Sequence, residues 1–143
     1  MTKVFAAILA VATGAALAGS AQAGPDRVKL VRFQTPSKNI GCLVSPAEGR
    51  RAGYLRCDIL SGVRPQPRGT CELDWTGYSM QGRGAARPTC AGDTVYAQRA
   101  RILRYGTIWK QVDFVCRSQR TGLRCTNAAG RGFVLARARS FAF

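Results

Sequence analysis

The stretch FVCRSQRTGLRCT, residues 114–126, consists of two short runs of strand-forming residues on either side of a polar turn. Such runs around a short turn predict a β-hairpin. In this hairpin Cys116 and Cys125 face each other, and directly opposed residues of an antiparallel pair have Cα atoms about 4.5 to 5.5 Å apart, within the range of a disulfide. The stretch therefore predicts a hairpin that is closed by its own disulfide.

The same pattern occurs earlier in the chain. Residues 40–45, IGCLVS, and residues 53–58, GYLRCD, each contain one cysteine and are separated by a polar loop, and both hairpins return through the tripeptide Leu-Arg-Cys. Six cysteines allow fifteen pairings. We therefore predict three disulfides, which are Cys42–Cys57, Cys116–Cys125 and, by the remaining pair, Cys71–Cys90.

Most of the other segments are also typical of short strands. They are rich in β-branched and aromatic residues, are bounded by turn residues, and show no helical stripe after residue 23. This predicts an all-β fold, a small single-domain antiparallel sheet or barrel-like structure stapled by three disulfides. Residues 61–89 are rich in proline and glycine and predict a long loop region pinned by Cys71 and Cys90. The other expected strands are 28–33, 54–60, 101–105, 107–112, 114–118, 122–126 and 132–137.

The first 23 residues are typical of a cleaved signal peptide. Lys3 precedes an apolar run over residues 4–18, and the small residues Ala21 and Ala23 mark the cleavage position. A retained membrane anchor is the alternative, but it needs about 20 continuous apolar residues. We expect a periplasmic or secreted domain at residues 24–143 with no integral membrane segment. In an oxidising compartment its six cysteines form a disulfide framework.

Positive charge dominates the expected mature chain. Without Lys3 it has 21 basic and seven acidic residues, a net charge of +14, and 18 of the basic residues are arginines. Such a charge attracts anionic polymers, among them lipopolysaccharide, acidic glycans and nucleic acid, and the guanidinium group suits phosphate, sulfate and carboxylate. The composition of a GC-rich genome explains the same charge without any binding role, so charge alone leaves both interpretations open.

Aromatic and arginine side chains are the candidate binding groups. Exposed aromatic rings form stacking platforms for sugars or bases, although in a small β domain most aromatic residues belong to the core. Residues 131–134, RGFV, are similar to the start of an RNA-recognition signature, but the similarity ends there. The candidate binding residues are Trp75, Tyr78, Arg83, Arg87, Trp109 and Arg131.

Few residue types are left for catalysis. The chain has no histidine, and bridged cysteines serve neither as nucleophiles nor as metal ligands. We therefore expect no catalytic residue, metal or cofactor, and a non-catalytic binder of anionic envelope or host polymers. One alternative is a carboxylate-based hydrolase of cell wall or glycan, and another is a protein-binding inhibitor or effector. The hydrolase would draw on Asp58, Asp74, Asp93 and Asp113.

Several landmarks, taken together, resemble those of a known family. They are F-x-TPS-x-NI-x-C at residues 33–42, GDTV at 92–95, L-x-YG-x-x-W at 103–109 and GL-x-C-x-N at 122–127. The chain resembles a family of small secreted bacterial proteins that carry a six-cysteine domain of unknown function. The resemblance implies a bacterial exported domain with three disulfides, and it carries over no catalytic or binding residue.

Overall fold

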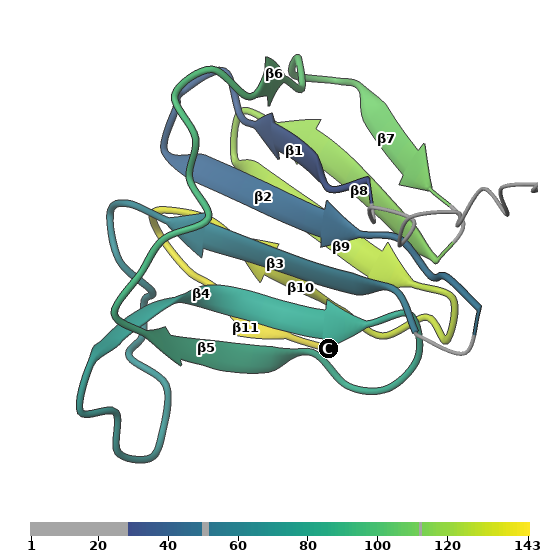
Figure 1. The fold of residues 1–143 in the computed structure, drawn as a ribbon. Coiled ribbons are helices and arrows are strands. Elements are labelled where there is room, and N and C mark those ends of the chain that lie inside the picture. The colour runs from purple at the N-terminus through teal and green to yellow at the C-terminus, as the bar shows by residue number, and fades with distance from the viewer. Residues whose placement is uncertain (1–28, 50–51, 112) are drawn as a thin grey trace, which may run out of the picture.

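The computed structural model describes residues 29–49, 52–111 and 113–143, so the expected signal peptide lies outside the described residues. The described residues form eleven β-strands and no helix, arranged in two sheets that pack face to face (Figure 1). The predicted all-β fold is therefore confirmed. In this part of the chain there is no helix of the length and apolarity needed to cross a membrane.

Sheet 1 has six strands in the order β5-β4-β3-β2-β1-β6. Its neighbouring strands are antiparallel except for β1 and β6, which pair in parallel. Since β5 and β6 lie at opposite edges, the connection between them, residues 92–100, runs from one edge of the sheet to the other (Figure 1). The strands are β1 Val31–Gln34, β2 Ile40–Ser45, β3 Tyr54–Ile59, β4 Asp74–Gln81, β5 Arg87–Ala91 and β6 Arg101–Ile102.

Sheet 2 has five antiparallel strands in the order β11-β10-β9-β8-β7. Burial alternates strictly along β8, where every second side chain is buried. This is the period-2 pattern of a sheet with one face on the core and one face toward solvent. The strands are β7 Ile108–Gln111, β8 Phe114–Gln119, β9 Gly122–Asn127, β10 Gly132–Leu135 and β11 Phe141–Ala142.

The core lies between the two sheets. Tyr78 of β4 stacks on Phe133 of β10, with ring centroids 5.9 Å apart, and Phe33 of β1 lies 5.1 Å from Trp109 of β7. Burial raises the pKa of the Tyr78 phenol. Each fully buried aliphatic or aromatic side chain contributes about 1.5 to 3 kcal/mol. The fully buried residues include Phe33, Phe133, Val44, Leu55, Phe114, Leu123 and Leu135.

The predicted disulfide pairing is confirmed for all three pairs. Cys42 lies directly opposite Cys57, and Cys116 directly opposite Cys125, with a Cα–Cα distance of 4.1 Å in each pair. These four cysteines belong to the core. The third disulfide joins Cys71, in the loop before β4, to Cys90 on β5 with a Cα–Cα distance of 5.7 Å. Three disulfides fit an oxidising compartment.

The predicted loop over residues 61–89 is wrong in its second half, because this part forms β4 and most of β5. β4 is antiparallel to β3 and buries Tyr78 and Met80. A side chain at residue 77 would not fit, since a Cβ on Gly77 would lie 1.9 Å from the carbonyl oxygen of Cys57. This strand is held by backbone pairing with β3 and by two buried side chains. Because its sequence has few apolar residues, the pattern of the sequence does not indicate a strand.

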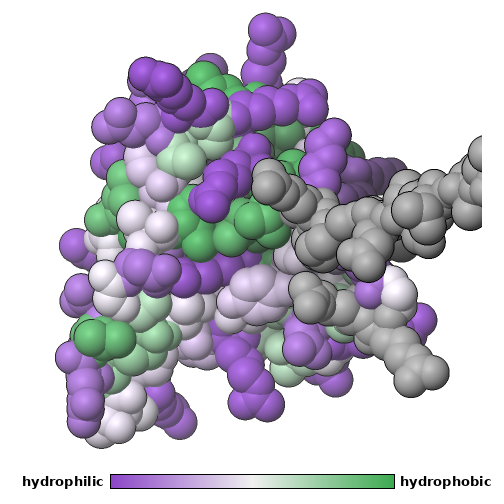
Figure 2. All heavy atoms as spheres, in the orientation of Figure 1, coloured by the Kyte–Doolittle hydropathy of each residue, from purple (hydrophilic) through white to green (hydrophobic). Residues whose placement is uncertain are grey.

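A connection between two strands covers part of the outer face of sheet 1. On sheet 1, the 92–100 connection crosses Gly41 and Asp58, and a Cβ on Gly41 would lie 2.8 Å from the Cα of Tyr96. Glycine at residue 41 therefore lets the connection pack against β2. Figure 2 shows hydrophilic and hydrophobic residues mixed over the side of the molecule that sheet 1 presents.

Candidate functional site

The three candidate aromatic residues do not form a common platform. Tyr78 is buried in the core, where Phe133 covers its ring. Trp109 is half-buried on β7 and packs against Phe33. Trp75 is half-buried on β4, in the other sheet, where it lines a pocket. Trp109 also lines a pocket, of about 380 Å³, so Trp75 is distinguished by the larger cavity, about 590 Å³.

The three candidate arginines are all exposed, but they lie at two turns of the chain. Arg83 and Arg87, at the turn between β4 and β5, line a shared hollow together with Tyr54. Arg131 lies between β9 and β10. They are exposed cations at the ends of strands and do not form a row across either sheet.

Among the aspartates, Asp58 is buried and fully engaged. Its Oδ1 and Oδ2 accept hydrogen bonds from Nε and Nη2 of Arg56, both at 3.0 Å. Thr76 Oγ1 donates to Oδ1 at 3.0 Å, and the backbone N of Val95 donates to Oδ2 at 2.9 Å. A carboxylate offers about four acceptor positions. With all of them occupied, Asp58 fixes the fold of sheet 1 and has no free position for moving a proton.

Arg56 is neutralised from two sides on the outer face of sheet 1. Besides Asp58, it contacts Asp93 of the crossing connection through Nη1 to Oδ1 at 3.0 Å and Nη2 to the backbone oxygen at 2.9 Å. Burial by itself would lower the pKa of the Arg56 guanidinium, but the hydrogen bonds and charges of Asp58 and Asp93 outweigh it and raise this pKa. The ion pairs between described residues are these two.

The outer face of sheet 2 carries two arginines without such partners. Arg117 of β8 is the register partner of Arg124 of β9, and both side chains are exposed. Like charges placed directly opposite each other destabilise a strand pair, on the scale of about 0.2 to 1 kcal/mol for cross-strand pairs. Neither arginine forms an ion pair with a carboxylate of the described residues. Within the described residues, the sheet therefore holds two neighbouring cations that no carboxylate balances.

Neighbouring residues extend this positive region. Lys110 of β7 is exposed and pairs in register with Val115, which shares the outer face with Arg117. The Cζ of Arg124 lies 3.8 Å from the ring centroid of Phe143, and that of Arg139 lies 5.5 Å from the ring centroid of Phe141. Cation–π contacts of about 0.5 to 1 kcal/mol hold a guanidinium in place and leave its charge intact. We name this surface the basic face: Lys110, Arg117, Arg124, Arg139, Phe141 and Phe143.

Acidic side chains are nearly absent from this part of the chain. Residues 108–143 contain seven basic residues and one acidic residue, Asp113. Asp113 lies in the turn between β7 and β8 and faces sheet 1, since a Cβ on Gly53 or Gly82 would lie 2.5 or 2.8 Å from its carboxyl group. The charge of the basic face is therefore not balanced by its own sheet.

A comparison with known protein families assigns the chain to one of them. Residues 7–143, which include all six cysteines, match the model of a family of unknown function. The chain belongs to DUF6636. No curated protein and no solved structure matches this DUF6636 chain. Its function is therefore argued from its own residues.

The sequence of this DUF6636 chain contains a signal for the opposed arginines of the basic face, namely the register of the predicted hairpin. If Cys116 faces Cys125 in a hairpin, then the next residue along one strand, Arg117, faces the preceding residue of the other, Arg124. The contacts of Arg124 with Phe143 had no such signal, because the position of β11 depends on the turn over residues 136–140.

Proposed function

We propose that this protein is a non-catalytic binder of an acidic polysaccharide, acting through the basic face of sheet 2 in the periplasm or outside the cell. The observation that carries the proposal is the opposed pair Arg117 and Arg124. If selection acted on folding alone, an acidic residue opposite or beside each arginine would stabilise the strand pair, as Asp58 and Asp93 do for Arg56 in sheet 1. Local conflicts with folding rules are expected where a protein has a function to perform.

The flat geometry of the basic face favours an extended polymer. Adjacent strands lie about 4.8 Å apart, and side chains on one face of a strand repeat at about 6.6 Å. The cations of three neighbouring strands, Lys110, Arg117 and Arg124, are thus spread over a surface rather than gathered in one cavity. Successive sulfate, phosphate or carboxylate groups along a chain can each meet one of them.

The aromatic rings of this face favour a polysaccharide over a nucleic acid. Binders of single-stranded nucleic acids offer open ring faces on which bases stack. Here Arg124 lies over Phe143 and Arg139 lies near the ring of Phe141, so arginines compete with bases for these rings. Contacts with the anionic groups remain available, and export, if it occurs as the first 23 residues predict, supports envelope or host glycans as the partner.

The test compares two double variants that remove the same charge from different places. Arg117→Gln with Arg124→Gln removes the opposed pair, and Arg83→Gln with Arg87→Gln removes two exposed arginines at the β4–β5 turn. We expect heparin affinity of the first variant to fall at least about tenfold, and the slope of log K against log salt to fall by about two, one for each lost contact. The control variant keeps most of its affinity and slope.

Three outcomes would contradict the proposal. Equal losses in both variants would mean that heparin responds to total charge and not to the basic face. Absence of heparin retention at low salt would remove the polyanion function altogether. Tighter binding of a single-stranded oligonucleotide than of heparin with the same number of charges would assign the face to nucleic acid.

A further inference from the structure

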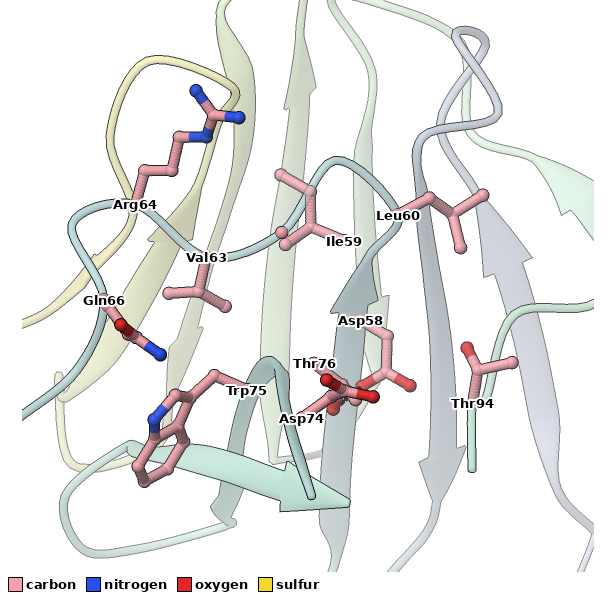
Figure 3. Close-up of a pocket in the computed structure, with 11 residues that line it drawn as sticks. Asp58, Ile59, Leu60, Val63, Arg64, Gln66, Asp74, Trp75, Thr76 and Thr94 are labelled. Atoms are coloured by element: carbon pink, nitrogen blue, oxygen red, sulfur yellow. Dashed lines mark hydrogen bonds between the residues drawn. The ribbon is translucent and has the colours of Figure 1, made fainter. Parts of the chain in front are cut away.

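Sheet 1 contains a pocket of about 590 Å³ that the basic face does not involve (Figure 3). Its walls are the end of β3, the start of β4, the loop over residues 60–66 and Thr94 of the crossing connection. Small-molecule sites in proteins usually enclose about 300 to 1,000 Å³. The pocket therefore has the size of a site for a small ligand or for one segment of a polymer.

An irregularity in β4 shapes the floor of this pocket. The register between β4 and β5 shifts between Trp75 and Gly77, so Thr76 is an extra residue in the strand. A bulge of this kind changes the direction of side chains, and bulges are common beside binding sites. As a result the consecutive residues Trp75 and Thr76 both line the pocket. Part of Trp75 packs against the core, and the rest stays accessible.

The loop that forms the opposite wall is held at several points. The backbone N of Leu60 donates to the carbonyl oxygen of Asn39 at 2.8 Å, and the Asn39 side chain forms two hydrogen bonds with Ser61, each at 3.0 Å. Farther along, the backbone N of Ser140 donates to the carbonyl oxygen of Arg64. The Cys71–Cys90 disulfide fastens the end of the loop to β5. A wall fixed in this way lowers the ordering cost of binding a ligand.

The groups that line the pocket combine an aromatic ring, mixed donors and acceptors and one cation, Arg64, whose guanidinium points away from Trp75 (Figure 3). In Figure 3 the amide of Gln66 lies beside the Trp75 indole, Asp74 lies with Thr76 near the middle, and Thr94 lies on the far side. Asp74 is exposed and is not ion-paired with any described residue. Asp58 also lines the pocket, but Arg56 and its other donors occupy its oxygens.

We infer that this pocket binds an uncharged pyranose sugar unit. One apolar face of the sugar ring lies on Trp75, and its hydroxyl groups donate to the Asp74 carboxylate and exchange hydrogen bonds with the Gln66 amide. A sugar presents both features at once, an apolar C–H face and a rim of hydroxyls, and so uses the ring, the acceptor and the amide together. An amine would use Trp75 and Asp74 but would gain no hydrogen bond from the amide donors of Gln66, which are exposed and stay bound to water.

The experiment titrates the full mature chain with two neutral probes, chitotriose and maltotriose, and follows tryptophan fluorescence and heat of binding. We expect saturable binding of at least one probe, insensitive to salt because no charge pairs are formed. Trp75→Ala removes the stacking surface and weakens binding at least about tenfold. Trp109→Ala, in the other sheet, is the matched control and leaves the affinity unchanged.

A second variant separates loss of binding from loss of folding. Asp74 is exposed, so Asp74→Asn keeps the shape of the site while exchanging an acceptor for a donor, and we expect about five- to tenfold weaker binding. Four results would overturn the inference: no saturation with either probe, an equal effect of Trp109→Ala, unchanged binding in both pocket variants, or capture of choline in preference to both sugars. The Arg117→Gln, Arg124→Gln variant keeps its sugar binding, so failure of the basic face and failure of the pocket are distinguishable.

Discussion

The hairpins β2–β3 and β8–β9 have the same plan and different outer faces. Each has two cysteines directly opposed in the core, and in each an arginine precedes the second cysteine. In the first hairpin Arg56 faces Leu43, and the residue after the second cysteine is Asp58, which binds Arg56. In the second hairpin the corresponding residues are Arg124, Arg117 and Thr126.

This difference separates what the fold requires from what it merely tolerates. The first hairpin balances its arginine with two carboxylates and is crossed by the 92–100 connection, so its outer surface serves the structure. The second hairpin gains a second arginine and has threonine in the place of the carboxylate. Both exchanges increase the positive charge. Arg117 is exposed and so adds no packing to the core, whereas Thr126 is half-buried. In the first hairpin the arginine is therefore paired with carboxylates, and in the second hairpin the corresponding arginine faces another arginine.

The largest expected effect tests the part that the hairpins share. Replacing Cys42 and Cys57 by alanine, or Cys116 and Cys125 by alanine, should each lower the free energy of unfolding by about 3 kcal/mol, since the closed loops are similar in length. Urea denaturation of the two variants measures both losses. A difference of more than about 2 kcal/mol between them would mean that the two disulfides are not structurally equivalent.

The next effect tests the balance of charge in the first hairpin. Asp58→Ala removes four accepted hydrogen bonds and leaves Arg56 with one carboxylate partner, the exposed Asp93. Removing one partner of a buried ion pair costs about 3 to 5 kcal/mol, and the loss here should be near the lower end because Arg56 is partly exposed and keeps Asp93. At the corresponding place in the second hairpin, Thr126→Ala removes one long hydrogen bond, from Oγ1 to the carbonyl oxygen of Val115 at 3.4 Å, and should lower the free energy of unfolding by no more than about 1 kcal/mol. Similar losses in both variants would contradict the structural role assigned to Asp58.

Both disulfides within hairpins, and their register, could be predicted from the sequence, because the interactions involved are local. A cysteine on each strand of a hairpin, with alternating neighbours, leaves one register in which the sulfur atoms meet on the core side. That register also determines that Arg117 and Arg124 oppose each other.

The remaining features depend on residues that are distant in the sequence. Asp58 accepts one of its hydrogen bonds from Val95, 37 residues later, and the sequence around Asp58 does not predict that contact. β4 exists because β3 pairs with it, and the bulge that brings Trp75 and Thr76 to one pocket depends on β5. Pairing between distant strands overrides local propensity, so the pocket could not be derived from composition or spacing.

A smaller effect tests the conflict within the second hairpin. Arg117→Leu places there the residue that faces the arginine in the first hairpin, Leu43. Loss of the like-charge contact should raise the free energy of unfolding by about 0.2 to 1 kcal/mol. Thermal and urea unfolding measure the difference in free energy of unfolding between this variant and the wild type. The difference should be smaller at high salt, because salt screens the repulsion between the two arginines of the wild type. A loss of stability would show that Arg117 serves the fold.

The smallest expected effect completes the conversion of one hairpin into the other. Thr126→Asp supplies Arg124 with a carboxylate at the position that Asp58 occupies relative to Arg56. An exposed pair of this kind is worth about 0.2 to 1 kcal/mol, so stability should rise only slightly. Heparin affinity should nevertheless fall, because the carboxylate competes with the polymer for Arg124 and repels its anionic groups. Thr126→Asn, which has nearly the same shape and no charge, should bind heparin like the wild type. If the asparagine variant loses as much affinity as the aspartate variant, residue 126 acts through its shape, and the charge difference between the two hairpins is not what distinguishes their functions.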